Sequence, residues 1–227
     1  MNITGSPQKL LWQYQTAIAK AGAGTVLAYI VVTTALYSAA DILMVEDGVY
    51  FLISIVGWAL GYLLLRYLMR ASAAPGEAPL SGFFGYFALG LVSGVVIIAG
   101  LILLIIPGLY LILRWLPAYA RLYVHGNGVV PALRWSWQET RALQKPLALA
   151  LIWPLLFLAL SLLGFFAVEI GWIASGESAS QAVSSSDIVL VVVNLLSGVS
   201  AAWTQVLGIA VYRMIERGEP DLIDTFS

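Results

Sequence analysis

The chain has 227 residues, of which 61% are hydrophobic and 10% are charged. Soluble domains usually carry about 25% charged residues, so this composition predicts an integral membrane protein. The 11 lysines and arginines nearly balance the 12 aspartates and glutamates, so net charge says nothing about nucleic acid, and the sequence has no basic patch large enough to bind it. The chain has no cysteine, which excludes disulfides, cysteine nucleophiles and thiolate metal sites.

The first predicted element is an amphipathic helix over residues 7–20. Pro7 suits the first turn of a helix. Apolar side chains such as Leu10, Leu11 and Ile18 fall on one face, and Lys9 lies opposite. This pattern is typical of a helix that lies in the headgroup region of a bilayer. A short helix packed on the loops is an equally open alternative.

Six apolar segments follow, each near the length of about 20 residues that crosses a bilayer. The fourth is the shortest, begins at Pro107-Gly108 and contains Arg114. The predicted spans are 22–40, 49–69, 83–106, 108–124, 146–168 and 188–212.

The distribution of charge favours all six spans. With a cytoplasmic N-terminus, every lysine and arginine except Arg114 then lies at the cytoplasmic face, and the outer loops carry carboxylates and no cation. Positive residues in short loops set the orientation of membrane proteins. We therefore predict an all-α polytopic membrane protein, residues 1–227 as a single domain. It would have six transmembrane helices, two amphipathic interfacial helices and both termini in the cytoplasm.

Two pairs of glycines four residues apart are expected to let helices approach closely in lipid. They lie in the second and third predicted spans, and packing within one subunit is favoured over a homo-oligomer. The glycines are Gly57, Gly61, Gly90 and Gly94.

The sixth predicted span carries a band of small polar residues. Most of them share one helical face, because they recur at steps of three and four. The favoured interpretation is a seam of hydrogen bonds between helices, and the alternative is one wall of a polar pathway. The residues of this band are Asn194, Ser197, Thr204 and Gln205.

Arg114 is predicted to be a structural clamp inside the membrane. A charge at that depth is costly and normally faces a partner or water. Asn194 would lie at nearly the same depth in the sixth span, so we expect the two residues to pair as part of one intramembrane polar cluster. Binding of a substrate anion by Arg114 is the alternative.

Residues 131–144 are predicted to form a second amphipathic helix. Ala132, Leu133 and Ser136 mark its small-to-apolar face. Its basic stripe is expected to contact anionic headgroups, at about 1 kcal/mol per cation, or a protein partner. The cations of the stripe are Arg134, Arg141 and Lys145.

No catalytic signature or metal-ligand cluster appears in the sequence. His125 is the only histidine, and we interpret it as an ordinary interfacial residue. The acidic tail is expected to be solvated. Its carboxylates are Glu216, Glu219, Asp221 and Asp224.

Two sequence blocks, P-G-x-Y-L-x-x-R-W and A-L-x-x-S-W-x-x-T-R, resemble those of the YciC-like family of bacterial inner-membrane proteins. That family is related to the membrane domain attached to some glycerophosphodiester phosphodiesterases. His125 departs from the acidic residue that such proteins often have before the glycine. The motif residues are Pro107, Gly108, Tyr110, Arg114, Ser136, Trp137 and Thr140.

The resemblance implies a multi-pass protein of the inner membrane and implies no reaction, because the phosphodiesterase belongs to a separate soluble domain. We therefore expect a non-catalytic module that organises lipid or binds a membrane or cytoplasmic protein, without a metal or other cofactor. The alternative is a small transporter or channel that uses Arg114 and the polar band.

Overall fold

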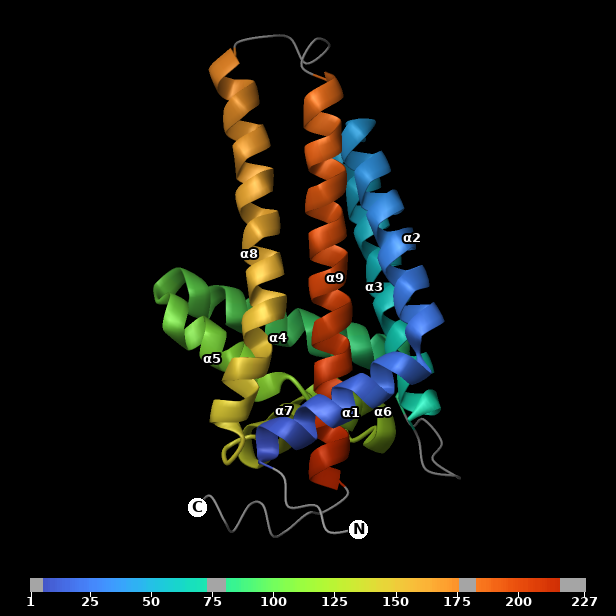
Figure 1. Ribbon diagram of the computed structural model, residues 1–227, viewed down its shortest axis with the longest axis vertical. Helices are drawn as coiled ribbons and strands as arrows, with labels where there is room; N and C mark the ends of the chain where they lie inside the picture. Colours follow the sequence, from blue (N-terminus) through green and yellow to red (C-terminus); the bar gives the residue numbers. More distant parts are fainter. Residues whose placement is uncertain (1–5, 73–80, 176–182, 217–227) are drawn as a thin grey trace. The chain divides into compact units, whose positions relative to one another are not determined.

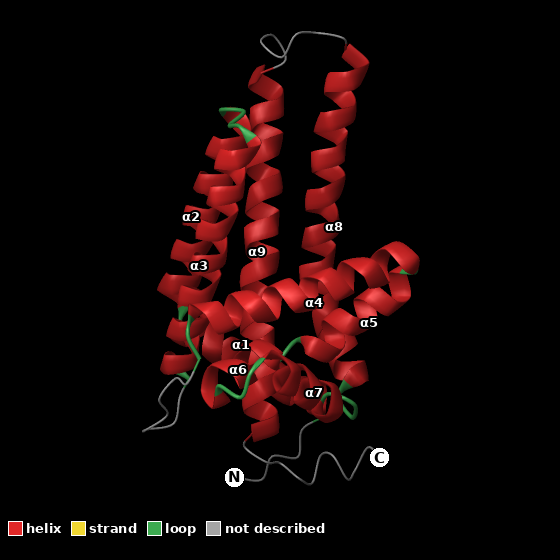
Figure 2. Ribbon diagram, turned by 180° about the vertical axis from the view of Figure 1, so that it is seen from behind, coloured by secondary structure: helices red, strands yellow, loops and turns green. Residues whose placement is uncertain are grey.

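The computed structural model describes residues 6–72, 81–175 and 183–216, which are all-helical (Figures 1 and 2). Across these ranges no strand occurs, so the predicted all-α class is confirmed. The helices are α1 (Pro7–Ala21), α2 (Ala23–Ile42), α3 (Asp47–Ala71), α4 (Phe83–Leu103), α5 (Ile105–Trp115), α6 (Ala118–His125), α7 (Val129–Glu139), α8 (Gln144–Ser175) and α9 (Val183–Glu216).

Five of these helices are long and apolar enough to cross a membrane, namely α2, α3, α4, α8 and α9. Only 17–28% of the residues in the most apolar stretch of each are buried inside the protein. Helices that are apolar on nearly all sides and remain exposed are typical of membrane spans. The architecture is therefore that of a multi-pass membrane protein.

The fourth predicted span, residues 108–124, is not one helix. It divides into α5, which ends at Trp115, and α6, which begins at Ala118. Pro117 lies at the break and has no N–H to donate to the carbonyl of Leu113, which would be its partner in a continuous helix. At about 1.5 Å per residue, the 11 residues of α5 rise only about 16 Å.

The residues predicted to form a single domain pack as two compact units. The first unit contains the described residues of 1–23, 65–151 and 204–227. The second contains 24–64 and the described residues of 152–203. Helices α3, α8 and α9 therefore each contribute residues to both units.

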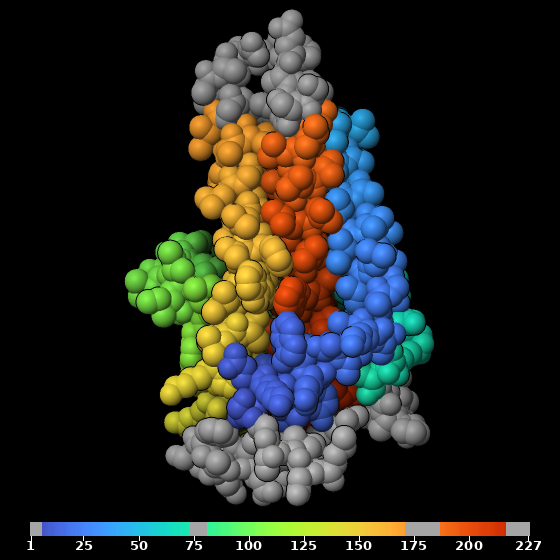
Figure 3. Space-filling model, viewed as in Figure 1, coloured from blue at the N-terminus to red at the C-terminus, as the bar shows by residue number. Residues whose placement is uncertain are grey.

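The second unit is built from close contacts between long helices. A Cβ at Gly57 in α3 would lie 2.2 Å from the hydroxyl oxygen of Tyr37 in α2. A Cβ at Gly164 in α8 would lie 2.6 Å from Val193 in α9. Side chains fill the space between the ribbons of α8 and α9 (Figure 3).

The first unit has a core where α4, α6 and α7 meet. Leu89, Leu122 and Leu133 are buried there with the small side chains Ala118 and Ala132. The helix α6 ends at Gly126, whose φ of 61° is in the left-handed region that favours glycine. A short Gly-Asn-Gly connection then leads into α7.

The helices α4 and α5 form an antiparallel hairpin in the first unit. A single residue, Leu104, separates them. A Cβ at Gly108 would lie 2.4 Å from the side chain of Leu101 and 2.7 Å from its backbone nitrogen, so the motif glycine permits the close approach. The C-terminal part of α9 runs across α4 instead of alongside it (Figures 1 and 2).

Candidate functional site

Arg114 joins α5 to α7 through hydrogen bonds in both directions. Its guanidinium donates to the backbone carbonyl of Trp137. Its own backbone carbonyl accepts from the Ser136 hydroxyl at 2.6 Å and from the Thr140 hydroxyl at 3.2 Å. The last carbonyls of a helix have no partner within that helix. Ser136 and Thr140 therefore cap the C-terminal end of α5, and both are fully buried.

Two aromatic rings flank the guanidinium of Arg114. Its Cζ lies 4.6 Å from the ring centroid of Trp137 and 5.7 Å from that of Tyr110. The two rings meet edge to face at 5.6 Å, and Gln144 donates to the Tyr110 hydroxyl at 3.3 Å. The electron-rich faces of aromatic rings attract a cation. Arg114 is only 2% exposed, so this contact is shielded from water.

No carboxylate in the described residues pairs with the Arg114 charge. Two of its nitrogens, Nε and Nη1, are buried without a hydrogen-bond partner there. Removal from water lowers the pKa of Arg114, the nearby Tyr110 raises it, and Arg141 lowers it further. A guanidinium keeps its proton in proteins, so the site holds a buried positive charge compensated by a carbonyl and two rings.

The two blocks of the sequence motif meet at this joint. Tyr110 and Arg114 come from the first block and contact Ser136, Trp137 and Thr140 of the second. Pro107 and Gly108 lie elsewhere, at the start of α5 near the hairpin turn. We name the five contacting residues the α5–α7 joint. The joint explains why the motif contains these residues, because each of them either caps α5 or contacts the guanidinium of Arg114.

The structure gives Arg114 and Asn194 different partners, contrary to the predicted clamp. Asn194 donates to the Asp41 carboxylate at 2.7 Å and to the Ser38 hydroxyl at 3.3 Å, within the second unit. Arg114 bonds within the first unit instead. The prediction placed Arg114 and Asn194 at the same depth in the membrane by assuming that the fourth span is one unbroken helix. The break at Pro117 makes that assumption wrong.

The other polar residues of α9 are also bonded to neighbouring helices. Ser200 donates to the carbonyl of Pro154 in α8 at 2.7 Å. Gln205 donates to the Tyr86 hydroxyl in α4 at 2.7 Å. Ser197 and Thr204 are half-buried. Two members of the band, Asn194 and Gln205, and the nearby Ser200 thus form hydrogen bonds between helices.

The predicted packing glycines have different surroundings. Gly61 and Gly90 are buried, and Gly57 contacts Tyr37 within the chain. A Cβ at Gly94 would have no atom within 4 Å. Packing within the subunit therefore accounts for Gly57, whereas Gly94 faces open space in the described part of the chain.

The predicted basic stripe is exposed. The helix α7 runs over Val129–Glu139, shorter than the predicted 131–144, and a turn follows it before α8 begins at Gln144. The apolar side of this segment is buried, including Leu133 and Leu143. The exposed cations form no ion pair with a residue that the structure describes. They are Arg134, Arg141 and Lys145.

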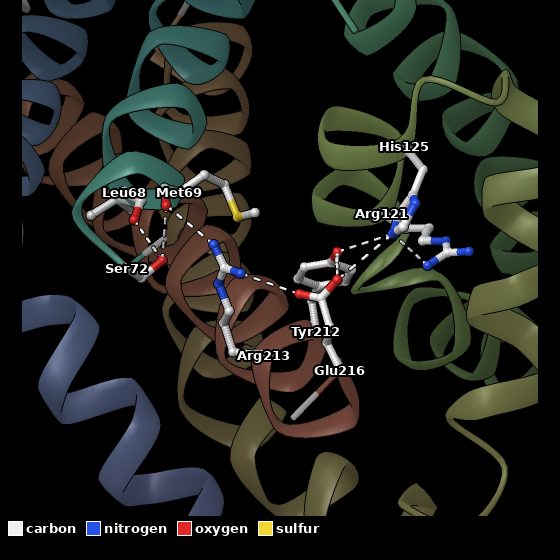
Figure 4. Close-up of polar contacts among 8 residues, drawn as sticks. All are labelled: Leu68, Met69, Ser72, Arg121, His125, Tyr212, Arg213 and Glu216. Atoms are coloured by element: carbon white, nitrogen blue, oxygen red, sulfur yellow. Dashed lines mark hydrogen bonds and ion pairs between the residues drawn. The ribbon is translucent and has the colours of Figure 1, made fainter. Parts of the chain in front are cut away.

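A second polar cluster, at the end of α9, was missed by the sequence analysis (Figure 4). Tyr212 donates to the Glu216 carboxylate at 2.5 Å, and its hydroxyl lies 3.3 Å from His125 Nε2. The same nitrogen lies 2.6 Å from Arg121 Nη1 and 3.7 Å from Glu216 Oε1. Arginine only donates, so Nε2 accepts here and the proton of a neutral imidazole is on Nδ1.

Arg213 extends this cluster to α3. Its Nη1 lies 3.2 Å from Glu216 Oε2 and its Nη2 donates to the Met69 carbonyl at 3.3 Å. Glu216 is thus bonded within the protein, contrary to the prediction of a solvated tail. Glu219, Asp221 and Asp224 lie outside the described residues. The spacing Tyr212, Arg213 and Glu216 places the three on one side of a helix, which was the available sequence signal.

The helix α1 buries one face, formed by Leu10, Leu11, Gln15 and Ile18. Trp12 is exposed beside this face. At the end of the helix, a Cβ at Gly22 would lie 2.2 Å from Leu68 of α3. The described contacts thus show α1 packed on protein along one side, with an aromatic side chain free on another.

Among the described residues no group of three histidine or carboxylate side chains is placed to hold a metal ion. Comparisons with protein-family models, with curated proteins and with solved structures give no match to this chain. The family resemblance therefore depends on the two motif blocks themselves.

Proposed function

We propose that this chain is a non-catalytic accessory protein of the bacterial inner membrane that binds anionic phospholipid headgroups through the basic stripe. The observation that carries the proposal is the setting of Arg134, Arg141 and Lys145. All three are exposed and lack an ion pair with the described residues. Each cation near an anionic surface contributes about 1 kcal/mol.

The α5–α7 joint supports this function because it fixes α7, which carries Arg134, and the turn after it, which carries Arg141; Lys145 follows at the start of α8. Ser136 and Thr140 hold one side of α7 to α5, and the Trp137 carbonyl accepts from Arg114. Arg134 and Arg141 are on the opposite, exposed side. A binding surface whose backbone is already ordered loses less conformational entropy when it binds.

We infer that both termini lie in the cytoplasm, because the cations then gather at one face. We also propose membership of the YciC-like family. What supports it is that two motif blocks separated in sequence make direct contacts through Tyr110, Arg114, Ser136, Trp137 and Thr140.

A transporter or channel is the second candidate function. The observation that favours it is the pair of unpartnered nitrogens on Arg114. The bonds made by Asn194, Ser200 and Gln205 favour the accessory function instead, because side chains engaged in ties between helices are less available to a solute. Solute flux into proteoliposomes that is lost in Arg114→Leu would establish the transporter.

The test uses the full-length protein in nanodiscs that contain equal amounts of phosphatidylglycerol and phosphatidylcholine. Energy transfer from the protein to fluorescent lipids measures which lipid is enriched around it. We expect phosphatidylglycerol to be enriched, and the triple substitution Arg134→Gln, Arg141→Gln and Lys145→Gln to reduce the enrichment.

The matched control removes three exposed cations from other helices, by Lys9→Gln, Lys20→Gln and Arg70→Gln. It should reduce the enrichment less, because these cations are spread over α1 and α3. An equal loss of phosphatidylglycerol enrichment in both triple variants would show that the total positive charge attracts the lipid and that the basic stripe is not a defined binding site. No enrichment in the parent protein would contradict lipid binding and leave a protein partner for the stripe.

A further inference from the structure

The start of α4 and the end of α6 lie at the same place in the first unit. Ser81, two residues before α4, donates its backbone N–H to the carbonyl of Tyr123 in α6 at 3.4 Å. The end of α3 is bonded to Arg213 of α9 through the Met69 carbonyl. His125, at the end of α6, contacts Tyr212 of the same α9 turn (Figure 4).

This geometry determines how often the chain crosses the bilayer between α3 and α7. Because the segment returns to its starting point, the number of crossings must be even. The helix α4 has the length of a span, but the 11 residues of α5 rise about 16 Å, roughly half of a hydrocarbon core of about 30 Å. The rest of the return is α6, which begins after the break at Pro117 and is packed in the core with α4 and α7, so the exposed apolar part of the return is too short to cross the bilayer.

The exposed part of the hairpin is entirely apolar. No polar side chain occurs from Gly94 to Leu109. Around the turn, the consecutive residues Ile102, Leu103, Leu104, Ile105 and Ile106 are 68–80% exposed. A patch of this kind in water would be a strong aggregation liability, so it marks a surface that apolar material covers.

The base of the hairpin, in contrast, carries two polar side chains that contact other helices, and it packs on protein along one side. Tyr86 accepts from Gln205, and Ser93 lies 3.4 Å from the Tyr119 hydroxyl. Leu89 is fully buried in the core beside α6 and α7. The half of α4 beyond Gly94 makes none of these contacts, and its length matches that of α5; nearer the base, Phe84 and Leu91 are also exposed.

The turn between the helices leaves few backbone groups unbonded. Leu104 donates to the Gly100 carbonyl at 3.0 Å, and its own carbonyl accepts from Gly108 at 3.5 Å. Pro107 is in the first turn of α5, where an N–H would have no helical partner. A short turn of this kind suits an apolar environment, where each unbonded polar group is costly.

We propose that the α4–α5 hairpin is a one-leaflet insertion. It enters the bilayer from the face that carries the basic residues, buries its tip among the acyl chains of that leaflet and returns to the same face. The chain then crosses the membrane four times, through α2, α3, α8 and α9. The acyl chains are the partner of the tip, and this inference goes beyond the proposed headgroup binding.

The absence of native cysteine makes single-cysteine labelling of the full-length protein direct. Four positions decide the topology: Gly82→Cys before the hairpin, Leu104→Cys at the tip, Asn127→Cys after α6 and Glu46→Cys in the α2–α3 turn. All four are exposed in the described structure. A membrane-impermeant maleimide is applied to right-side-out and to inside-out vesicles.

We expect positions 82 and 127 to be labelled from one side and position 46 from the other. Position 104 should be labelled from neither side. A fluorophore attached there should be quenched by brominated lipids, and Ile106→Cys provides a second tip position. These outcomes are independent of lipid charge, so they remain informative if headgroup binding fails.

Three results would overturn the inference. Labelling of position 127 together with position 46 would mean that α4 crosses alone. Labelling of position 104 from the side of position 46 would mean that the hairpin reaches the opposite surface. Labelling of both tip positions from the side of position 82, without quenching by lipid, would place the tip in water.

Discussion

Arg114 and Arg213 are both nearly excluded from water, at 2% and 4% exposure, but they are held by different chemistry. Arg114 donates to a carbonyl and is flanked by the rings of Tyr110 and Trp137. Arg213 pairs with the Glu216 carboxylate and donates to the Met69 carbonyl. Arg213 also lies 5.6 Å from the ring centroid of Tyr212, so the two anchors differ chiefly in the counter-charge, which Arg114 lacks among the described residues.

The difference determines which group each anchor depends on. The α5–α7 joint contains no carboxylate among the described residues, so its stability depends on the shape and planarity of the guanidinium. The cluster at the end of α9 depends on Glu216, whose side chain is 31% exposed and reachable by water and salt. The two anchors should consequently respond differently to substitution.

Arg114→Lys should have the largest effect. An ammonium is compact and strongly hydrated and cannot stack as a planar group between two rings. A buried charged group without its partners costs more than the usual 1–3 kcal/mol, so we expect a loss of about 3 kcal/mol of unfolding free energy in mixed micelles.

Arg114→Leu is the matched control, because it removes the contacts without burying a charge. It should lose less than Arg114→Lys, about 1–2 kcal/mol from the missing cation–π contacts and carbonyl bond. Ser136 and Thr140 bond to the backbone of residue 114, so they remain bonded in both variants. If Arg114→Lys were more stable than Arg114→Leu, an anionic partner would lie near residue 114, and the contrast between Arg114 and Arg213 would be wrong.

Glu216→Ala should cost about 1–2 kcal/mol, because it removes the counter-charge of the buried Arg213 and water compensates in part. Glu216→Gln keeps an acceptor for Tyr212 and should lose less. Unfolding of both variants in the same micelles gives the comparison. Equal losses in the two variants would show that the charge of Glu216 contributes little.

The capping hydroxyls of the α5–α7 joint should show coupled effects. Ser136 donates to the Arg114 carbonyl at 2.6 Å, whereas Thr140 shares its one proton between that carbonyl at 3.2 Å and the Ser136 carbonyl at 2.7 Å. Each single alanine variant thus leaves one donor near the Arg114 carbonyl, and we expect a cost of about 1 kcal/mol for Ser136→Ala and less for Thr140→Ala. The double variant leaves the carbonyl without a described donor and should lose more than the sum. Strict additivity in a double-mutant cycle would mean that the carbonyl is not their shared partner.

His125→Gln should have the smallest effect. The amide oxygen of glutamine can accept from Arg121 as the imidazole does, and the site is about one-third exposed. A change below about 0.5 kcal/mol is expected for such an exposed contact. His125→Leu, which cannot accept, serves as the control. A large loss in the glutamine variant would show that the imidazole itself is required.

The sequence by itself determined the membrane class and the helical content. These properties depend on local composition, because about 20 apolar residues in a row have few other stable arrangements. It also identified the residues of the α5–α7 joint as a group. Pro7 correctly marked the start of α1, since proline at that position acts through local backbone geometry.

Only the tertiary structure decided the partners of Arg114, the role of Glu216 and the break at Pro117. Hydropathy registers how apolar a segment is, and residues 108–124 are apolar whether they form one helix or two. The partner of a buried arginine depends on which helix packs beside it, and that depends on contacts between distant parts of the chain. The depth of Arg114 along the predicted span could not identify its partner, because the predicted span is interrupted at Pro117.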